Sequence, residues 1–162
     1  MKISSIFKQI NLFERYRELC LSYSKAVYGN TRPPKDLVLD TFKKFDWHVK
    51  YVAKDKIYIL KYQLGDYSLE YYFELNGSSL GVAIYIKRGN EWPMHHDLGY
   101  LLNLSNLYPN DPDDDLIGKV IYCSTLLDLE DIIKKIKPLL EDFKNVTEPY
   151  LKIDNIEFDI SA

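Results

Sequence analysis

The chain has 162 residues, of which 46% are hydrophobic and 28% are charged, and its formal net charge is −3. This length and composition predict one folded domain with a substantial core and exclude a disordered chain. The sequence contains no apolar run of about 18 residues, so no membrane-spanning helix and no membrane partner are expected.

Charged residues interrupt the N-terminal segment, which therefore lacks the apolar centre of a secretory signal peptide. We accordingly expect a cytoplasmic protein. Apolar residues recur every three or four positions over residues 4–28, which predicts one amphipathic helix that stops at Gly29. A second helix is predicted over residues 34–44, where Pro34 or Lys35 can occupy its first turn.

The most regular pattern lies in residues 47–87, where apolar residues alternate as they do in antiparallel strands. Turns are predicted at Lys54-Asp55, at Gly65-Asp66 and at Asn76-Gly77, the last as a type I′ hairpin. Two-residue loops at the first two turns place five pairs on one face: Tyr51 with Tyr58, Val49 with Leu60, Trp47 with Tyr62, Leu60 with Tyr71, and Tyr58 with Phe73. This agreement between registers is expected of a real sheet.

The second face of the predicted sheet is mixed in character. Aromatic and apolar side chains are rimmed by charged ones: Val52, Ile57, Ile59, Tyr72 and Tyr85 by Lys50, Lys61, Glu70 and Glu74. Such a surface is typical of a protein interface. Alternatively, a helix covers this face and the sheet is the middle layer of a sandwich.

The rest of the chain predicts a loop at residues 89–93, a short helix over 96–107, a polar loop at 108–115 and a fifth strand at 120–123. Asp128 is expected to cap a last helix, which Pro138 should kink or end. Residues 150–162 form either an edge strand or a loose tail. These elements predict a single α+β domain over residues 1–162, with an antiparallel sheet of about five strands and helices packed on at least one face.

Two histidines and a carboxylate, His95, His96 and Asp97, are the best candidates for an active site, because they could ligate a metal or transfer protons. Adjacent histidines point in different directions, however, so the simpler interpretation is one exposed and one packed histidine. The cysteines Cys20 and Cys123 have no ligand spacing and are expected to be buried and unpaired. No cofactor is expected.

The C-terminal third is acidic, since residues 111–162 contain six basic and thirteen acidic residues. Acids at alternate positions, Asp111, Asp113 and Asp115, resemble half a calcium loop, but its turn glycine and closing glutamate are missing. The alternatives are a solvated loop or a surface that captures basic side chains of a partner. Direct nucleic-acid binding is not expected, because Glu70 and Glu74 beside the tyrosines would repel phosphates.

A small, acidic, tyrosine-rich α+β chain without a catalytic motif resembles the immunity proteins that bacteria pair with polymorphic or contact-dependent growth inhibition toxins. The resemblance implies a toxin inhibitor, not an enzyme, that binds a cognate toxin domain, often a basic nuclease, one to one. It implies the partner contacts Asp111, Asp113, Asp114, Asp115, Tyr72, Asp154, Glu157 and Asp159. The alternatives are a dimeric secretion-effector chaperone and a small metal-dependent enzyme that uses residues 95–97.

Overall fold

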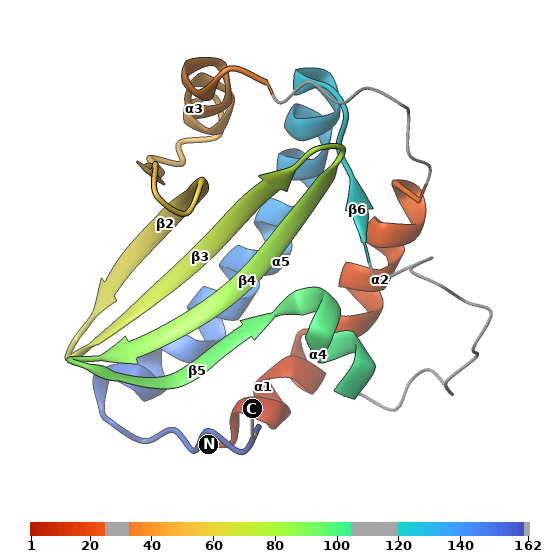
Figure 1. Ribbon diagram of the computed structural model, residues 1–162. Helices are drawn as coiled ribbons and strands as arrows, with labels where there is room; N and C mark the ends of the chain where they lie inside the picture. The colour runs from red at the N-terminus through yellow and green to blue at the C-terminus, as the bar shows by residue number, and fades with distance from the viewer. Residues whose placement is uncertain (25–32, 105–119, 161–162) are drawn as a thin grey trace.

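The computed structural model describes residues 1–24, 33–104 and 120–160, which form five helices and a six-stranded antiparallel sheet (Figure 1). This architecture confirms the predicted α+β class. The helices are α1 (Ile3–Gln9), α2 (Leu12–Ser22), α3 (Lys35–Lys43), α4 (Leu98–Leu104) and α5 (Leu126–Lys152). The strands are β1 (Lys50–Val52), β2 (Ile57–Leu64), β3 (Tyr67–Asn76), β4 (Ser79–Arg88), β5 (Glu91–Asp97) and β6 (Ile121–Tyr122).

The first five strands form a meander in which each strand pairs with the next, and β6 pairs with the start of β4. Three predicted pairs are confirmed: Tyr51 with Tyr58, Tyr58 with Phe73, and Leu60 with Tyr71. The pairs predicted for Trp47 and Val49 are not formed, because the ladder of β1 begins at Lys50. Trp47 instead packs against the ring of Phe42 in α3.

The third hairpin turn lies one residue later than predicted. Asn76 pairs with Ser79, so that Gly77 and Ser78 form the loop. Gly77 has φ of +59°, whereas neither Asn76 nor Ser78 has positive φ. Glycine at the first loop position with positive φ fits a type II′ turn and not the predicted type I′.

Residues 91–97 form strand β5, although the sequence predicted a loop followed by a helix from His96. Ala83 pairs with Asp97, and Tyr85 pairs with His95. Pro93 is compatible with this strand because β5 is the last strand of the meander, where one backbone edge needs no N–H donor. Helix α4 consequently begins at Leu98.

Two helix predictions are also corrected. The N-terminal helix is divided into α1 and α2 at Asn11, whose φ of 51° and ψ of 45° are left-handed. The N-cap of α5 is Thr125, and Asp128 completes a capping box with it. Helix α5 continues through Pro138 and Pro149 to its end at Lys152.

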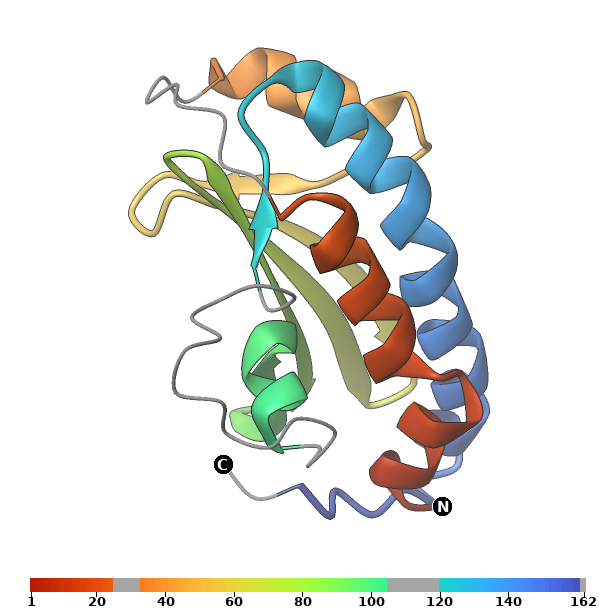
Figure 2. The same ribbon diagram turned by 90° about the vertical axis from the view of Figure 1, so that its right-hand side faces the viewer.

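The helices and one face of the sheet enclose the hydrophobic core (Figures 1 and 2). Helix α5 runs behind the sheet in Figure 1, and the buried Tyr71 hydroxyl of β3 donates a hydrogen bond of 2.6 Å to its Leu140 carbonyl. Cys20 and Cys123 are buried and unpaired as predicted. Burial raises the pKa of each thiol to about 12, so both remain protonated at neutral pH.

The segment after α5 lies along the N-terminal segment and does not extend the sheet. Lys2 and Glu157 form an isolated parallel bridge. Backbone hydrogen bonds run from Ile3 N to the Glu157 carbonyl and from Glu157 N to the Met1 carbonyl. Among the described helices, none combines the length and the apolar character that crossing a membrane requires.

Candidate functional site

The sheet face opposite the helices is here called the open face. Its strand register places on it Lys50, Val52, Ile57, Ile59, Lys61, Ser68, Glu70, Tyr72, Glu74, Gly81, Ala83, Tyr85, Lys87, His95 and Asp97. Ile57, Ile59, Tyr72 and Tyr85 are half-buried, whereas most of the alternating residues on the other face, such as Tyr58, Phe73 and Ile84, are buried. None of the described helices covers this face, so the described residues do not form the alternative three-layer sandwich (Figure 1).

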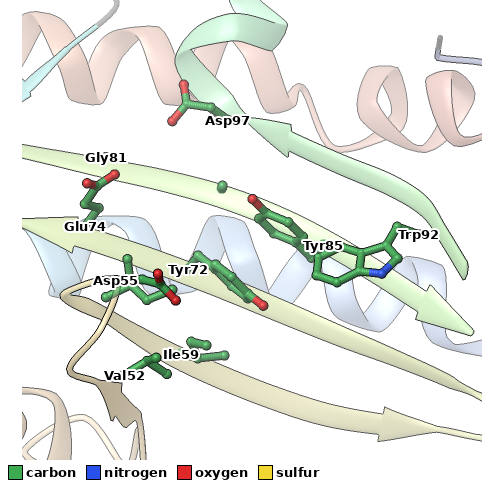
Figure 3. A pocket seen from close by; sticks show the side chains of 11 residues that line it. Val52, Asp55, Ile59, Tyr72, Glu74, Gly81, Tyr85, Trp92 and Asp97 are labelled. Atoms are coloured by element: carbon green, nitrogen blue, oxygen red, sulfur yellow. The ribbon is translucent and has the colours of Figure 1, made fainter. Parts of the chain in front are cut away.

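The open face contains a hollow of about 590 Å³ (Figure 3). Its lining residues come from β1 to β5 and from the first turn: Val52, Asp55, Ile57, Ile59, Tyr72, Glu74, Gly81, Ala83, Tyr85, Trp92 and Asp97. The hollow exists because β4 carries the small residues Gly81 and Ala83 next to the longer side chains of Glu74 and Tyr72 in β3 and of Asp97 in β5. Its volume is within the range of ligand-binding pockets.

One wall of the hollow is a series of aromatic rings. The rings of Tyr72 and Tyr85 are stacked with centroids 4.1 Å apart and an interplanar angle of 17°. The Trp92 ring meets Tyr85 edge to face at 5.6 Å and is 48% exposed. Stacked and edge-to-face rings contribute attraction beyond their buried area, so this wall is pre-formed.

A buried ion pair supports the aromatic wall. Glu70 is 4% exposed and accepts hydrogen bonds from Lys87 Nζ at 2.6 Å and from the Tyr72 hydroxyl at 2.9 Å. Lys61 Nζ lies 3.3 Å from its other oxygen. Burial opposes ionisation of Glu70, but these hydrogen bonds outweigh it and hold its pKa below the ordinary value. The Lys87 ammonium also lies 4.1 Å from the centroid of the Trp92 ring.

Three carboxylates, those of Asp55, Glu74 and Asp97, stand around the other end of the hollow (Figure 3). Within the described residues, none of the three lies within ion-pair distance of a basic side chain. Desolvation raises the pKa of Asp97, and the negative charge of Glu74 raises it further. Hydrogen bonds from the backbone N–H groups of Tyr100 and Gly99 lower this pKa, but the net shift is upward. This end of the hollow therefore carries uncompensated negative charge.

Those predicted partner contacts that lie in the described residues do not form one cluster. Tyr72 is part of the aromatic wall. Asp111, Asp113, Asp114 and Asp115 lie outside the described residues, and their predicted role stays a prediction. Asp154 binds Arg88 at 2.9 Å and accepts a hydrogen bond of 2.6 Å from Tyr67. Tyr67 is five residues from Tyr72 on β3, or about 17 Å at about 3.4 Å per residue.

Glu157 and Asp159 contact the N-terminal segment. Glu157 lies 3.6 Å from Lys2 Nζ, and both side chains are more than half exposed. Asp159 accepts hydrogen bonds from the backbone N–H and the hydroxyl of Ser4. These contacts join the two ends of the described chain, and a further role toward a partner stays a prediction.

The two histidines of the proposed metal-dependent enzyme differ in burial, although their ring centroids are only 5.7 Å apart. His95 is exposed on the open face, whereas His96 is 5% exposed on the other face. One exposed and one packed histidine is thus confirmed. Desolvation and the neighbouring His95 lower the pKa of His96, so its ring is neutral at pH 7. Across residues 1–24, 33–104 and 120–160, no three His, Cys, Asp or Glu side chains are grouped closely enough to hold a metal ion.

Several residues of the hollow were not predicted from the sequence as part of a site with Tyr72: Asp55, Gly81, Ala83, Trp92 and Asp97. The sequence did contain one signal, because Gly81 and Ala83 alternate with the buried Leu80, Val82 and Ile84. Two successive small residues on the outward positions of a strand indicate a depression in that face. Trp92 and Asp97 could not be placed because β5 was not predicted.

Comparison of the chain with protein-family models, with curated proteins and with solved structures finds no significant match.

Proposed function

We propose that this protein is an immunity protein, which binds a cognate toxin domain and blocks its activity in the cytoplasm of the bacterium that makes the toxin. The observation that carries the proposal is the open face, where a pre-formed aromatic wall and uncompensated carboxylates surround one hollow. Half-exposed apolar and aromatic side chains with a charged rim are the usual composition of a protein-binding surface.

The charge of this surface favours a basic partner. Carboxylates around an apolar centre accelerate the association of a positively charged protein and orient it on the surface. Aromatic side chains such as Tyr72 and Trp92 then provide the contact area that holds such complexes together. A nuclease domain, which is basic because it binds phosphates, fits this description.

The test asks whether the gene next to this chain's gene encodes a toxin domain, and then uses that domain in a growth assay. Cells that express the toxin domain alone should stop growing, and cells that also express this chain should grow. The purified proteins should form a one-to-one complex in light scattering after gel filtration. The double variant Tyr72→Ala, Trp92→Ala should lose protection, whereas Asp36→Asn on the exposed surface of α3 should keep it.

Continued growth arrest at equal expression, together with no complex between the purified proteins, would refute the proposal. A dimer of this chain that binds an extended segment of the partner and leaves the toxin active would favour the effector-chaperone alternative instead.

A further inference from the structure

We propose that the hollow of the open face receives an arginine side chain from the partner protein, and that Glu74 and Asp97 bind its guanidinium. The source of the arginine rests on the proposed function, whereas the chemistry of the hollow does not. The occupant is inferred from three properties of the hollow: its shape, its charge and its aromatic wall.

The shape leaves room for a side chain between the two carboxylates. A Cβ atom added at Gly81 would lie 3.7 Å from Glu74 Cβ and 3.9 Å from Asp97 Oδ2. These are ordinary van der Waals distances, so a methyl group would fit above Gly81 in contact with both acids, and the glycine leaves that space to the hollow. Ile57 and Ile59 continue the hollow as an apolar floor, along which the methylene stem of an arginine can lie.

The charge of the hollow selects an organic cation. Asp55, Glu74 and Asp97 repel anionic ligands, and no ion pair within the described residues neutralises them. They are also too dispersed to be ligands of one metal ion, since the described residues contain no such group of three. A cation with several donors on a wide head group can reach carboxylates that a single metal ion cannot.

The aromatic wall favours arginine over lysine. A planar guanidinium can stack on the Tyr72 ring and still donate hydrogen bonds from its edges to two carboxylates. A lysine ammonium has no such plane. The chain also supplies its own ammonium at the other end of the wall, where Lys87 lies over Trp92 and is bound by Glu70.

The test titrates the full chain with the peptide acetyl-Gly-Arg-Gly-amide and follows its backbone amide signals by NMR. The control peptide carries citrulline, which has the shape of arginine without its charge. The arginine peptide should shift the signals of Gly81, Ala83 and Asp97, and the citrulline peptide should bind about tenfold more weakly, as the loss of a charge-assisted hydrogen bond predicts.

Three variants complete the experiment. The double variant Glu74→Gln, Asp97→Asn should weaken arginine-peptide binding about tenfold or more. Gly81→Val should block binding by filling the hollow, and valine suits a strand. Asp36→Asn, which removes an exposed carboxylate on α3, should bind like the unchanged chain. Circular dichroism spectra of each variant should match the spectrum of the unchanged chain, which checks that the variant is folded.

Equal binding of the two peptides, or full binding by Gly81→Val, would overturn the inference. These experiments also distinguish a failure of the arginine site from a failure of the immunity function. If the toxin complex forms with unchanged affinity in Glu74→Gln, Asp97→Asn, the arginine site is wrong and the immunity function stands. If the arginine peptide binds as expected but no toxin is neutralised, the site stands and the function is wrong.

Discussion

Glu70 and Lys87 form an ion pair of 2.6 Å on the open face, with only 5% and 18% of their side chains exposed. The pair is nearly dry because the rings of Tyr72 and Trp92 lie beside the Lys87 ammonium. The open face, which none of the described helices covers, therefore contains one region in which a buried carboxylate is paired with a lysine. The acidic hollow begins next to it.

Loss of the lysine from this pair should destabilise the protein. Lys87→Met leaves the Glu70 carboxylate buried without its nearest cation, which should lower the free energy of unfolding by about 2 kcal/mol. Urea denaturation monitored by circular dichroism measures the change. Lys61→Met is the matched control, because Lys61 is 56% exposed and its ion pair should contribute less than about 1 kcal/mol. A Lys87→Met variant as stable as the unchanged chain would contradict the prediction.

Asp97 should make the protein less stable as its carboxylate ionises. The pKa of Asp97 is raised in the folded state, chiefly by desolvation, whereas it is about 3.9 in the unfolded chain. The free energy of unfolding therefore falls as pH rises from about 3.9 through the raised folded pKa. Asp97→Asn should therefore be more stable than the unchanged chain at pH 7 and equal to it at pH 3. Asparagine can still accept the hydrogen bond from Tyr100 N.

Urea denaturation at both pH values tests the Asp97 prediction, and Asp55→Asn is the control because Asp55 is exposed in a turn. If Asp97→Asn changes stability equally at pH 3 and pH 7, ionisation of this carboxylate is not the cause.

The break between α1 and α2 should depend on the backbone freedom of residue 11. Asn11 has left-handed dihedral angles, which asparagine and glycine tolerate better than other residues. Asn11→Ala should lower the free energy of unfolding by about 1 kcal/mol, while Asn11→Gly should preserve it. Thermal unfolding of the two variants measures the difference. Equal melting temperatures would show that the left-handed conformation imposes no cost on alanine.

The capping box of α5 should contribute measurably to stability. The Thr125 hydroxyl accepts a hydrogen bond of 3.0 Å from Asp128 N, and Asp128 Oδ2 accepts one of 2.9 Å from Thr125 N. Thr125→Ala should lower the free energy of unfolding by about 1 kcal/mol. Thr125→Ser keeps the hydroxyl and should retain most of this contribution to stability. Urea denaturation of both variants checks this order, and a serine variant as unstable as the alanine variant would exclude the hydroxyl as the cause.

The sequence predicted the faces of strands β2, β3 and β4 well because one alternating pattern runs through all three. It predicted the register of β2 against β3 but not that of β3 against β4, whose turn lies at Gly77 and Ser78. The alternation and the two turns predicted at Lys54-Asp55 and Gly65-Asp66 together paired Tyr51, Tyr58 and Leu60 with their correct partners. Strand β5 was missed because its buried positions are Met94 and a histidine, and because Pro93 is typical of loops.

The predicted helix boundaries were wrong where tertiary packing overrides the local preference of the sequence. The apolar stripe continues through Asn11 because α1 and α2 face the same core, so periodicity alone does not reveal the break. In α5, inward residues before and after Pro138 are buried, among them Ile136 and Leu140. Their burial keeps the chain helical through a residue that cannot donate a backbone hydrogen bond.

The candidate site was only half predictable. Tyr72, Glu74 and Tyr85 follow from the alternation within β3 and β4. Trp92 and Asp97 join them only through the pairing of β5, and Asp55 joins through the shape of a turn. Convergence of segments that are distant in the sequence depends on tertiary structure, which a local pattern does not encode.

The order of the elements along the chain has a consequence for synthesis on the ribosome. The hairpins of the meander join neighbouring segments and can close quickly, before residues 126–152 have been made. The α5 contact between Tyr71 and Leu140 spans 69 residues and must come later. Until then the nascent sheet presents its apolar face to solvent, so the growing chain is expected to be most prone to aggregation before α5 emerges and docks.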